Sequence, residues 1–194
     1  MVSAKPDLPL VFFESAAEWE AWLADHHATA TGLWIKLARK SSGLESVTYE
    51  EAVERALRYG WIDGQGGSLD ETHWRQRFSP RTSRSKWSKI NRTRAENLIA
   101  EGLMRPAGLR EVERARADGR WEAAYDAPST ATVPDDLRQA LERSRDARDF
   151  FAGLDSRNRF AILHRIQDAK KPETRVRRIE KFVAMLARQE KPYP

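Results

Sequence analysis

The chain has 194 residues, of which 40% are hydrophobic and 32% charged, and its formal net charge is +5. This composition is typical of a folded globular protein with one or two domains, and it excludes disordered and fibrous chains. Because cysteine is absent, disulfides, thiolate nucleophiles, iron–sulfur clusters and cysteine-bound zinc are excluded as well.

The first sixty residues predict alternating strands and helices. Short apolar runs at Leu8–Phe13 and Gly32–Ala38 are typical of strands. Capping boxes that begin at Ser15 and Thr48 each predict a helix, because the cap side chain and the acid three residues later satisfy free N–H groups. Gly60 stands where a left-handed residue usually ends the second helix.

A hairpin is predicted after Gly60. Residues Trp61–Asp63 read as a strand, Gly64–Gly67 as a turn and Thr72–Phe78 as a returning strand. We therefore expect an α+β fold, in which residues 1–102 form a small mixed αβ domain with a short antiparallel sheet.

From Ser79 onward the pattern predicts a loop and then helices. Pro106 fits a first helical turn, and a Pro/Ser/Thr linker is expected at Pro128–Thr132. We expect residues 103–194 to form an all-helical domain. The helices predicted after Ser79 lie at residues 88–101, 106–118, 134–144, 146–152, 157–169 and 173–188.

Charge is distributed unevenly along the chain. Residues 1–71 carry 6 Lys/Arg and 12 Asp/Glu, whereas residues 72–95 carry 8 Lys/Arg and no acid, and residues 157–188 carry 10 against 3. Concentrated positive charge attracts small anions, nucleic acid or acidic protein surfaces, so these are the expected partners. The alternative is that the basic segments pair with the acidic ones inside the fold.

A candidate anion site lies just before the helix expected at residue 88. Arg81, Arg84 and Lys86 precede a helix start, where the dipole and free N–H groups favour an oxyanion and guanidinium groups bind it bidentately. Trp87 offers a stacking face. The candidate ligand-binding residues are Trp61, Asp63, Arg75, Arg77, Arg81, Arg84, Ser85, Lys86, Trp87, Ser88 and Asn91.

The same residues allow a purely structural interpretation. Trp87 is then a buried anchor, Ser85 or Ser88 caps the helix, and the arginines are solvated or paired with acids. Asp63 is either an acid–base group or part of a turn or cross-strand ion pair. His73 is either an acid–base group near neutral pH or a cross-strand contact.

No catalytic residue, metal or cofactor is expected. The histidines lack the spacing of a metal site, and Gly64–Gly67 lacks the Lys-Ser/Thr and helix of a phosphate loop. No apolar run approaches the ~20 residues of a membrane span, and the first ten residues lack the apolar core of a secretory signal. We therefore expect no membrane span and a cytoplasmic location.

Three motifs carry a resemblance to a known family: Gly60-Trp-Ile-Asp-Gly64, Phe78-Ser-Pro-Arg81 and Ser85-Lys-Trp-Ser-Lys-Ile-Asn91. With them, most of the chain resembles the YdeI/OmpD-associated family, also labelled bacteriocin-protection or OmdA-like, whose helical part corresponds to about residue 133 onward. The resemblance implies an association with an outer-membrane porin and with tolerance of antimicrobial peptides. It implies no reaction and no ligand.

Three functions remain open. The first is a non-enzymatic protein that binds an anionic ligand or nucleic acid in a stress or bacteriocin-tolerance role. The second is an enzyme for a small phosphorylated or carboxylated substrate, with Asp63 or His73 as acid–base group and Arg81 as clamp. The third is a protein–protein adaptor that exposes an apolar patch around Phe182 and Leu186.

Overall fold

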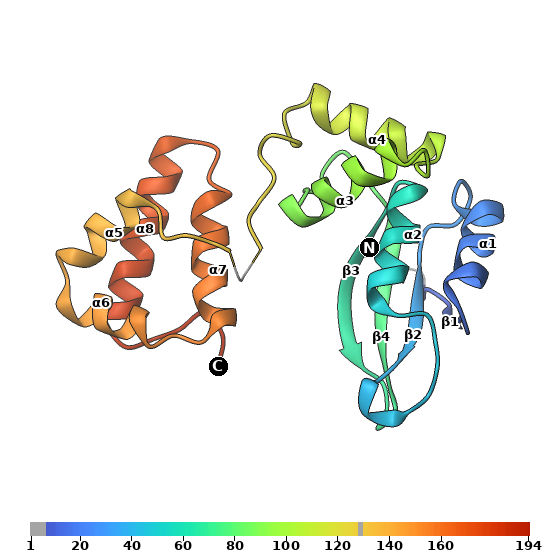
Figure 1. Cartoon of the computed structure of the whole chain (residues 1–194). Helices are drawn as coiled ribbons and strands as arrows, with labels where there is room; N and C mark the ends of the chain where they lie inside the picture. The colour runs from blue at the N-terminus through green and yellow to red at the C-terminus, as the bar shows by residue number, and fades with distance from the viewer. Residues whose placement is uncertain (1–6, 128–129) are drawn as a thin grey trace, which may run out of the picture. The chain divides into compact units, whose positions relative to one another are not determined.

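Four strands and eight α-helices make up the described part of the chain, which comprises residues 7–127 and 130–194 of a computed structural model (Figure 1). The α+β class is confirmed. Pro128 and Ser129 of the predicted linker lie outside the described residues. The elements are β1 (Leu10–Phe12), α1 (Ala16–His26), β2 (Leu33–Ala38), the 3₁₀ helix η1 (Lys40–Ser42), α2 (Tyr49–Arg58), β3 (Trp61–Ser68), β4 (His73–Pro80), α3 (Lys89–Ala100), α4 (Pro106–Ala117), α5 (Asp135–Glu142), α6 (Arg145–Ala152), α7 (Ser156–Gln167) and α8 (Pro172–Ala187).

The strands form one sheet in the order β1-β2-β4-β3. The β2–β4 and β3–β4 pairs are antiparallel, but β1 pairs parallel with β2. The sheet is therefore mixed, not wholly antiparallel as expected. The reason is that α1 connects β1 to β2, and such a crossover returns the chain in the same direction.

The hairpin of β3 and β4 is longer than predicted. Strand β3 continues through Gly64–Gly67, where a turn was expected, with a bulge between Asp63 and Gly66. The turn lies instead beyond Ser68, where the Asp70 carboxylate accepts the backbone N–H groups of Thr72 at 2.9 Å and His73 at 2.7 Å. Glycines accommodate a bulge as readily as a turn, so their presence alone does not locate the reversal.

Helices α1 and α2 cover one face of the sheet. Trp19 of α1 is fully buried, its ring lies 5.7 Å from the Phe78 ring, and its indole N–H donates to the Ala52 carbonyl of α2 at 3.0 Å. The Trp61 ring packs edge-on against Trp19 at 6.1 Å. An aromatic core therefore holds both helices against β3 and β4.

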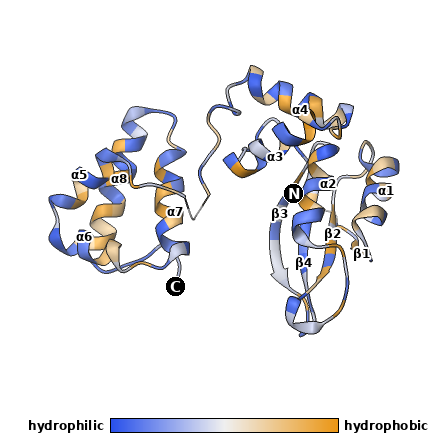
Figure 2. Cartoon of the chain, viewed as in Figure 1, coloured by the Kyte–Doolittle hydropathy of each residue, from blue (hydrophilic) through white to orange (hydrophobic). Residues whose placement is uncertain are grey.

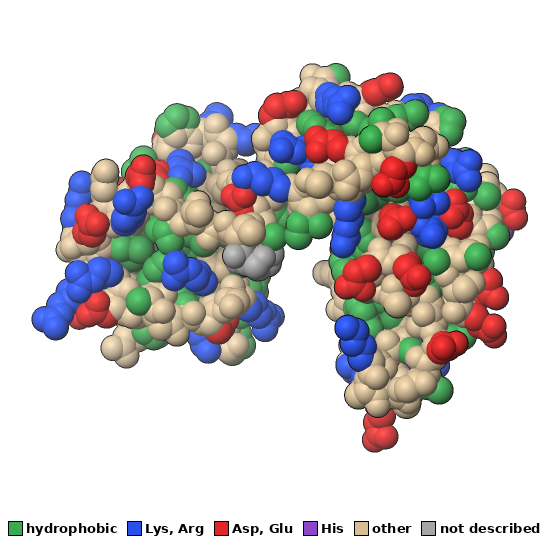
Figure 3. Space-filling model, viewed as in Figure 1, with side chains coloured by type: hydrophobic (Ala, Val, Ile, Leu, Met, Phe, Trp, Pro, Cys, Tyr) green, Lys and Arg blue, Asp and Glu red, His purple; other side chains and the backbone are tan. Residues whose placement is uncertain are grey.

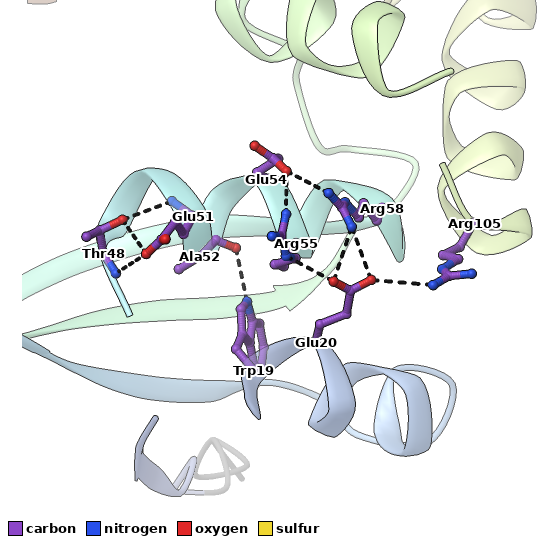
Figure 4. A network of polar contacts seen from close by, with 9 residues as sticks. All are labelled: Trp19, Glu20, Thr48, Glu51, Ala52, Glu54, Arg55, Arg58 and Arg105. Atoms are coloured by element: carbon purple, nitrogen blue, oxygen red, sulfur yellow. Dashed lines mark hydrogen bonds and ion pairs between the residues drawn. The ribbon is translucent and has the colours of Figure 1, made fainter. Parts of the chain in front are cut away.

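A network of charged side chains links α1, α2 and the start of α4 (Figure 4). The Glu20 carboxylate of α1 accepts ion pairs from Arg55 at 3.0 Å, Arg58 at 3.1 Å and Arg105 at 3.5 Å. Arg58 is only 8% exposed and also pairs with Glu54 at 2.8 Å. Glu20 thus supplies charge compensation for a buried guanidinium.

The chain divides into two compact units, residues up to 87 together with 91–123, and residues 88–90 together with 124–194. Helix α4 belongs to the first unit, where Gly108 lies against the carbonyl groups that end α2. The division into domains at residues 1–102 and 103–194, which we expected from the sequence, stays a prediction.

The second unit has its own core, formed by α5 to α8. Figure 2 shows hydrophobic residues along α7 and α8. Phe182 is 5% exposed and Leu186 is fully buried within this core. The apolar patch that an adaptor would expose around these two residues is therefore not on the surface of the described chain.

Candidate nucleic-acid interface

The sheet has a second face, opposite α1 and α2, which we call the open face. Successive residues of a strand point to opposite sides, so the strand pairing assigns each side chain to a face. Two of its large apolar side chains are solvent-exposed, Leu10 by 47% and Phe12 by 42%. The open-face positions are Leu10, Phe12, Trp34, Lys36, Ala38, Ile62, Gly64, Gly67, His73, Arg75, Arg77 and Ser79.

Arg75 and Trp34 form a stack at the middle of the open face. The Arg75 Cζ lies 4.6 Å from the centre of the Trp34 ring. Trp34 is opposite Arg77 in the pairing of β2 with β4, so Arg75 reaches the ring from the neighbouring diagonal position. A guanidinium over an indole is held by cation–π attraction, and Arg75 is exposed to solvent.

Two glycines of β3 make room for the arginines of β4. A Cβ at Gly64 would lie 3.3 Å from the Arg77 Nε, and a Cβ at Gly67 would lie 3.8 Å from the Arg75 Nε. A side chain at Gly64 would crowd the Arg77 guanidinium, and one at Gly67 would bring its Cβ into contact with the Arg75 guanidinium. The glycines of the predicted turn therefore shape the surface around Arg75 and Arg77.

The open face carries cations without acids. Lys36, Arg75 and Arg77 occupy neighbouring paired positions, and no Asp or Glu occupies an open-face position in the four described strands. Lys36 reaches the Asp70 carboxylate at the hairpin end at 3.9 Å. Arg75 and Arg77 form no ion pair with a described carboxylate, and such concentrated positive charge raises a local potential that attracts anions.

The other side of the first unit has the opposite charge. In the view of Figure 3, Asp and Glu side chains gather over the first unit, which shows its α2 side. Glu14, Glu45, Glu50 and Glu51 line a cavity of about 670 Å³ on this side, against the basic residues Arg39 and Lys40. An anion is thus favoured at the open face and not in this cavity.

Arg81 and Trp87, two residues of the predicted loop site, face the interior. Both are at least 95% buried, and the Arg81 Cζ lies 3.6 Å from the Trp87 ring centre. The Arg81 Nη1 donates to the Lys86 carbonyl at 3.1 Å. Arg84 and Lys86 are exposed, so the structure separates them from Arg81.

A second arginine binds the same loop. The Arg120 Nη1 donates to the Ser85 carbonyl at 2.8 Å, and the Ser85 hydroxyl accepts the Thr82 N–H at 3.0 Å. Ser85 and its neighbours are therefore tied into contacts within the chain. Asn91 lies half-buried in α3 of the first unit, whereas Ser88 pairs with Tyr125 in the second unit.

Trp61 and Asp63 lie on the helix-covered face. Trp61 is 1% exposed and donates its indole N–H to the His27 carbonyl at 3.1 Å. Asp63 accepts the Tyr49 hydroxyl at 2.8 Å. Burial, followed by the nearby Asp63 carboxylate, raises the pKa of Tyr49, so its hydroxyl stays protonated and keeps donating.

Asp63 and His73 do not form an acid–base pair. They lie on opposite faces of the sheet, and Asp63 is paired with Phe78, five residues along β4 from His73. Neither residue lines the 670 Å³ cavity. The enzyme hypothesis needs only one of them together with Arg81 as clamp, and Arg81 is 95% buried.

Trp34, Lys36 and Phe12 belong to the open face but were not among the candidate residues from sequence. Trp34 is half-buried. The sequence did carry a period-two signal. In β2, Trp34 and Lys36 alternate with the buried Leu33, Ile35 and Leu37, and in β4 the arginines Arg75 and Arg77 alternate with buried residues. Only the pairing of β2 with β4 shows that the two polar sets share a face.

Among residues 7–127 and 130–194, no group of three His, Asp or Glu side chains is placed to hold a metal ion. None of the helices in this part of the chain has the length and hydropathy to cross a membrane.

Comparisons with known proteins match each half of the chain to a different description. Residues 130–189 match the family model "Bacteriocin-protection, YdeI or OmpD-Associated", which confirms the resemblance for this helical part of the chain. Residues 11–111, just over half of the chain, match "Domain of unknown function (DUF8412)". Searches of curated proteins and of solved structures found no match. The chain thus belongs to the DUF8412 family of unknown function, with a YdeI/OmpD-associated segment at residues 130–189.

Proposed function

We propose that this protein binds nucleic acid through the open face of its sheet, without catalysing a reaction. The observation that carries the proposal is the grouping of Lys36, Arg75 and Arg77 around Trp34, with no acid at an open-face position of the described strands. A folded protein gains little from such a grouping, since like charges on one face repel each other. A negatively charged phosphate backbone attracts each of these cations, so a bound nucleic acid replaces their mutual repulsion with a net attraction.

Aromatic and apolar side chains on the same face favour a nucleic acid over a simple anion. Trp34 and the exposed Phe12 and Leu10 would contribute nothing to binding of inorganic phosphate. Nucleic-acid-binding surfaces commonly combine aromatic side chains, which stack on bases, with basic side chains, which bind phosphates. We place this activity in the cytoplasm and, following the family description, in a stress or bacteriocin-tolerance role.

The test compares two double variants with the same loss of charge. Arg75→Gln/Arg77→Gln removes two cations from the open face, and Arg84→Gln/Lys86→Gln removes two exposed cations from the loop. Fluorescence anisotropy with a labelled 20-nucleotide DNA measures the dissociation constant between 50 and 300 mM NaCl.

We expect the open-face variant to bind at least tenfold more weakly and to lower the log–log salt slope by up to about 1.4, since each lost phosphate contact in a single strand lowers it by about 0.7. The loop variant should stay within threefold of the native protein. Loss of binding in the loop variant alone, or no binding by the native chain, would overturn the proposal.

A further inference from the structure

We infer that the open face binds single strands, with one nucleobase stacked on the outer plane of Arg75 above Trp34. This inference rests on the proposed function and names the form of nucleic acid that the site accepts. It starts from the geometry of the stack, in which the exposed Arg75 guanidinium lies 4.6 Å above the half-buried ring.

A guanidinium is a flat, delocalised group, and that of Arg75 belongs to an exposed residue. Nucleobases stack on aromatic rings and on guanidinium planes alike, and guanidinium adds attraction for the electron-rich base. Trp34 is held in place because its strand neighbours in the pairing are Leu10 on one side and Arg77 on the other. The platform is therefore fixed before a ligand arrives, and little ordering is left to be done on binding.

Phe12 offers a second apolar surface, and its distance from Trp34 is larger than the distance between stacked bases in a duplex. Phe12 pairs with Lys36, two residues along the strands from Trp34, and its side chain is 42% exposed. Two residues of a strand span ~7 Å. Stacked bases along one strand are ~3.4 Å apart, so bases that contact both Trp34 and Phe12 must be unstacked from each other.

The width of the surface also disfavours a duplex. The major groove of duplex DNA admits a helix or a two-stranded ribbon, but not the face of a four-stranded sheet. A duplex would reach only the tips of the cations and leave Trp34 unused. A single strand can lie flat on the sheet, and the missing side chains at Gly64 and Gly67 leave its path across β3 clear.

Arg77 completes the site as a phosphate contact, and Lys36 does so by exchanging its 3.9 Å ion pair with Asp70 for a phosphate. Arg77 is opposite Trp34 in the pairing, and Lys36 is opposite Arg75. Each cation thus flanks the stacking platform on a neighbouring strand. This arrangement assigns different roles to chemically identical residues: Arg75 acts through its plane, whereas Arg77 acts through its charge.

Two conservative variants separate these roles. Arg75→Lys keeps the positive charge and removes the plane, and Arg77→Lys is the matched control on the same strand. Binding to oligo(dT) and oligo(U) of 20 nucleotides, and to a 20-base-pair duplex DNA, is measured by anisotropy at 100 mM NaCl. Thermal unfolding of both variants checks that the fold is kept.

We expect the native protein to bind both single strands at least tenfold more tightly than the duplex. Arg75→Lys should weaken single-strand binding about tenfold, in the range for loss of one base stack, and Arg77→Lys should change it less than threefold. Duplex binding as tight as single-strand binding, or equal effects of the two variants, overturns the inference and leaves the proposed function standing. Absence of binding to all three probes overturns both.

Discussion

The guanidinium of Arg81 lies 3.6 Å above the Trp87 ring, and both side chains are buried. Because Arg81 also donates to the carbonyl group of Lys86, its side chain closes residues 81–87 into a fixed loop. On β4, the strand that leads into this loop, Arg75 also lies over a tryptophan ring, that of Trp34, but at the surface. One type of contact is therefore buried in the fold in one case and lies at the surface in the other.

Replacing Arg81 with alanine should lower the free energy of unfolding by about 3 kcal/mol. The variant loses a desolvated cation–π contact and a charge-assisted hydrogen bond. Arg84→Ala is the control, and since Arg84 is exposed its effect should stay within about 0.5 kcal/mol. Urea denaturation followed by circular dichroism measures both. Native stability in Arg81→Ala together with lost nucleic-acid binding would instead identify Arg81 as a ligand contact.

Local sequence signals predicted the helices of the first unit well. The Thr48 hydroxyl accepts the Glu51 N–H at 3.3 Å, and the Glu51 carboxylate accepts the Thr48 N–H at 2.9 Å, as its capping box requires. The Ser15 hydroxyl likewise accepts the Glu18 N–H at 3.4 Å. Such caps involve residues three apart, so one short segment contains all the information.

The candidate site could be predicted only in part, because strand pairing joins residues far apart in the chain. The eight cations of residues 72–95 were visible as a group. Arg75 and Arg77 of β4 lie on the open face, whereas Arg81 is buried, and this difference depends on which residues pack against each side chain. Trp34 joins Arg75 through a pairing between strands about forty residues apart, which no local pattern encodes.

Replacing Glu20 with glutamine should destabilise the first unit by about 2 kcal/mol, because it removes one of the two carboxylates that compensate the buried Arg58 and leaves only Glu54. Arg105→Ala is the matched control. That side chain is more than half exposed and meets Glu20 at 3.5 Å, so its loss should cost less than about 1 kcal/mol. Chemical denaturation decides the order of the two effects. An Arg105→Ala variant less stable than Glu20→Gln would contradict this account of the network.

Gly60→Ala should be more destabilising than Gly102→Ala, although both glycines have a positive φ, +73° and +69°. Each substitution places an L side chain in the left-handed region, which costs about 1–2 kcal/mol. At Gly60 the new Cβ would also lie 2.8 Å from the Ala107 carbonyl oxygen, whereas nothing lies within 4 Å at Gly102. Overpacking adds about 1–3 kcal/mol. Equal melting temperatures for the two variants would show that α4 moves away from Gly60 at no cost.

The Asp70 turn should make the β3–β4 hairpin sensitive to acid. Hydrogen bonds from the Thr72 hydroxyl and from the backbone N–H groups of Thr72 and His73 lower the pKa of Asp70 from 3.8 to about 2. A carboxylate whose pKa is lower in the folded state stabilises that state fully above its unfolded pKa. The stabilisation is lost as the pH falls from about 4 through 2.

Thr72→Val tests the cause of this shift, because it removes the hydroxyl that contributes most and keeps the side-chain shape. A carboxyl titration followed by NMR should give a midpoint near 2 for Asp70 in the native protein and a higher one, closer to the ordinary value, in the variant. Hydrogen exchange at the Thr72 and His73 amides should accelerate over the same pH range as the carboxylate protonates. A midpoint that does not move in Thr72→Val would show that the backbone N–H groups alone set the pKa of Asp70.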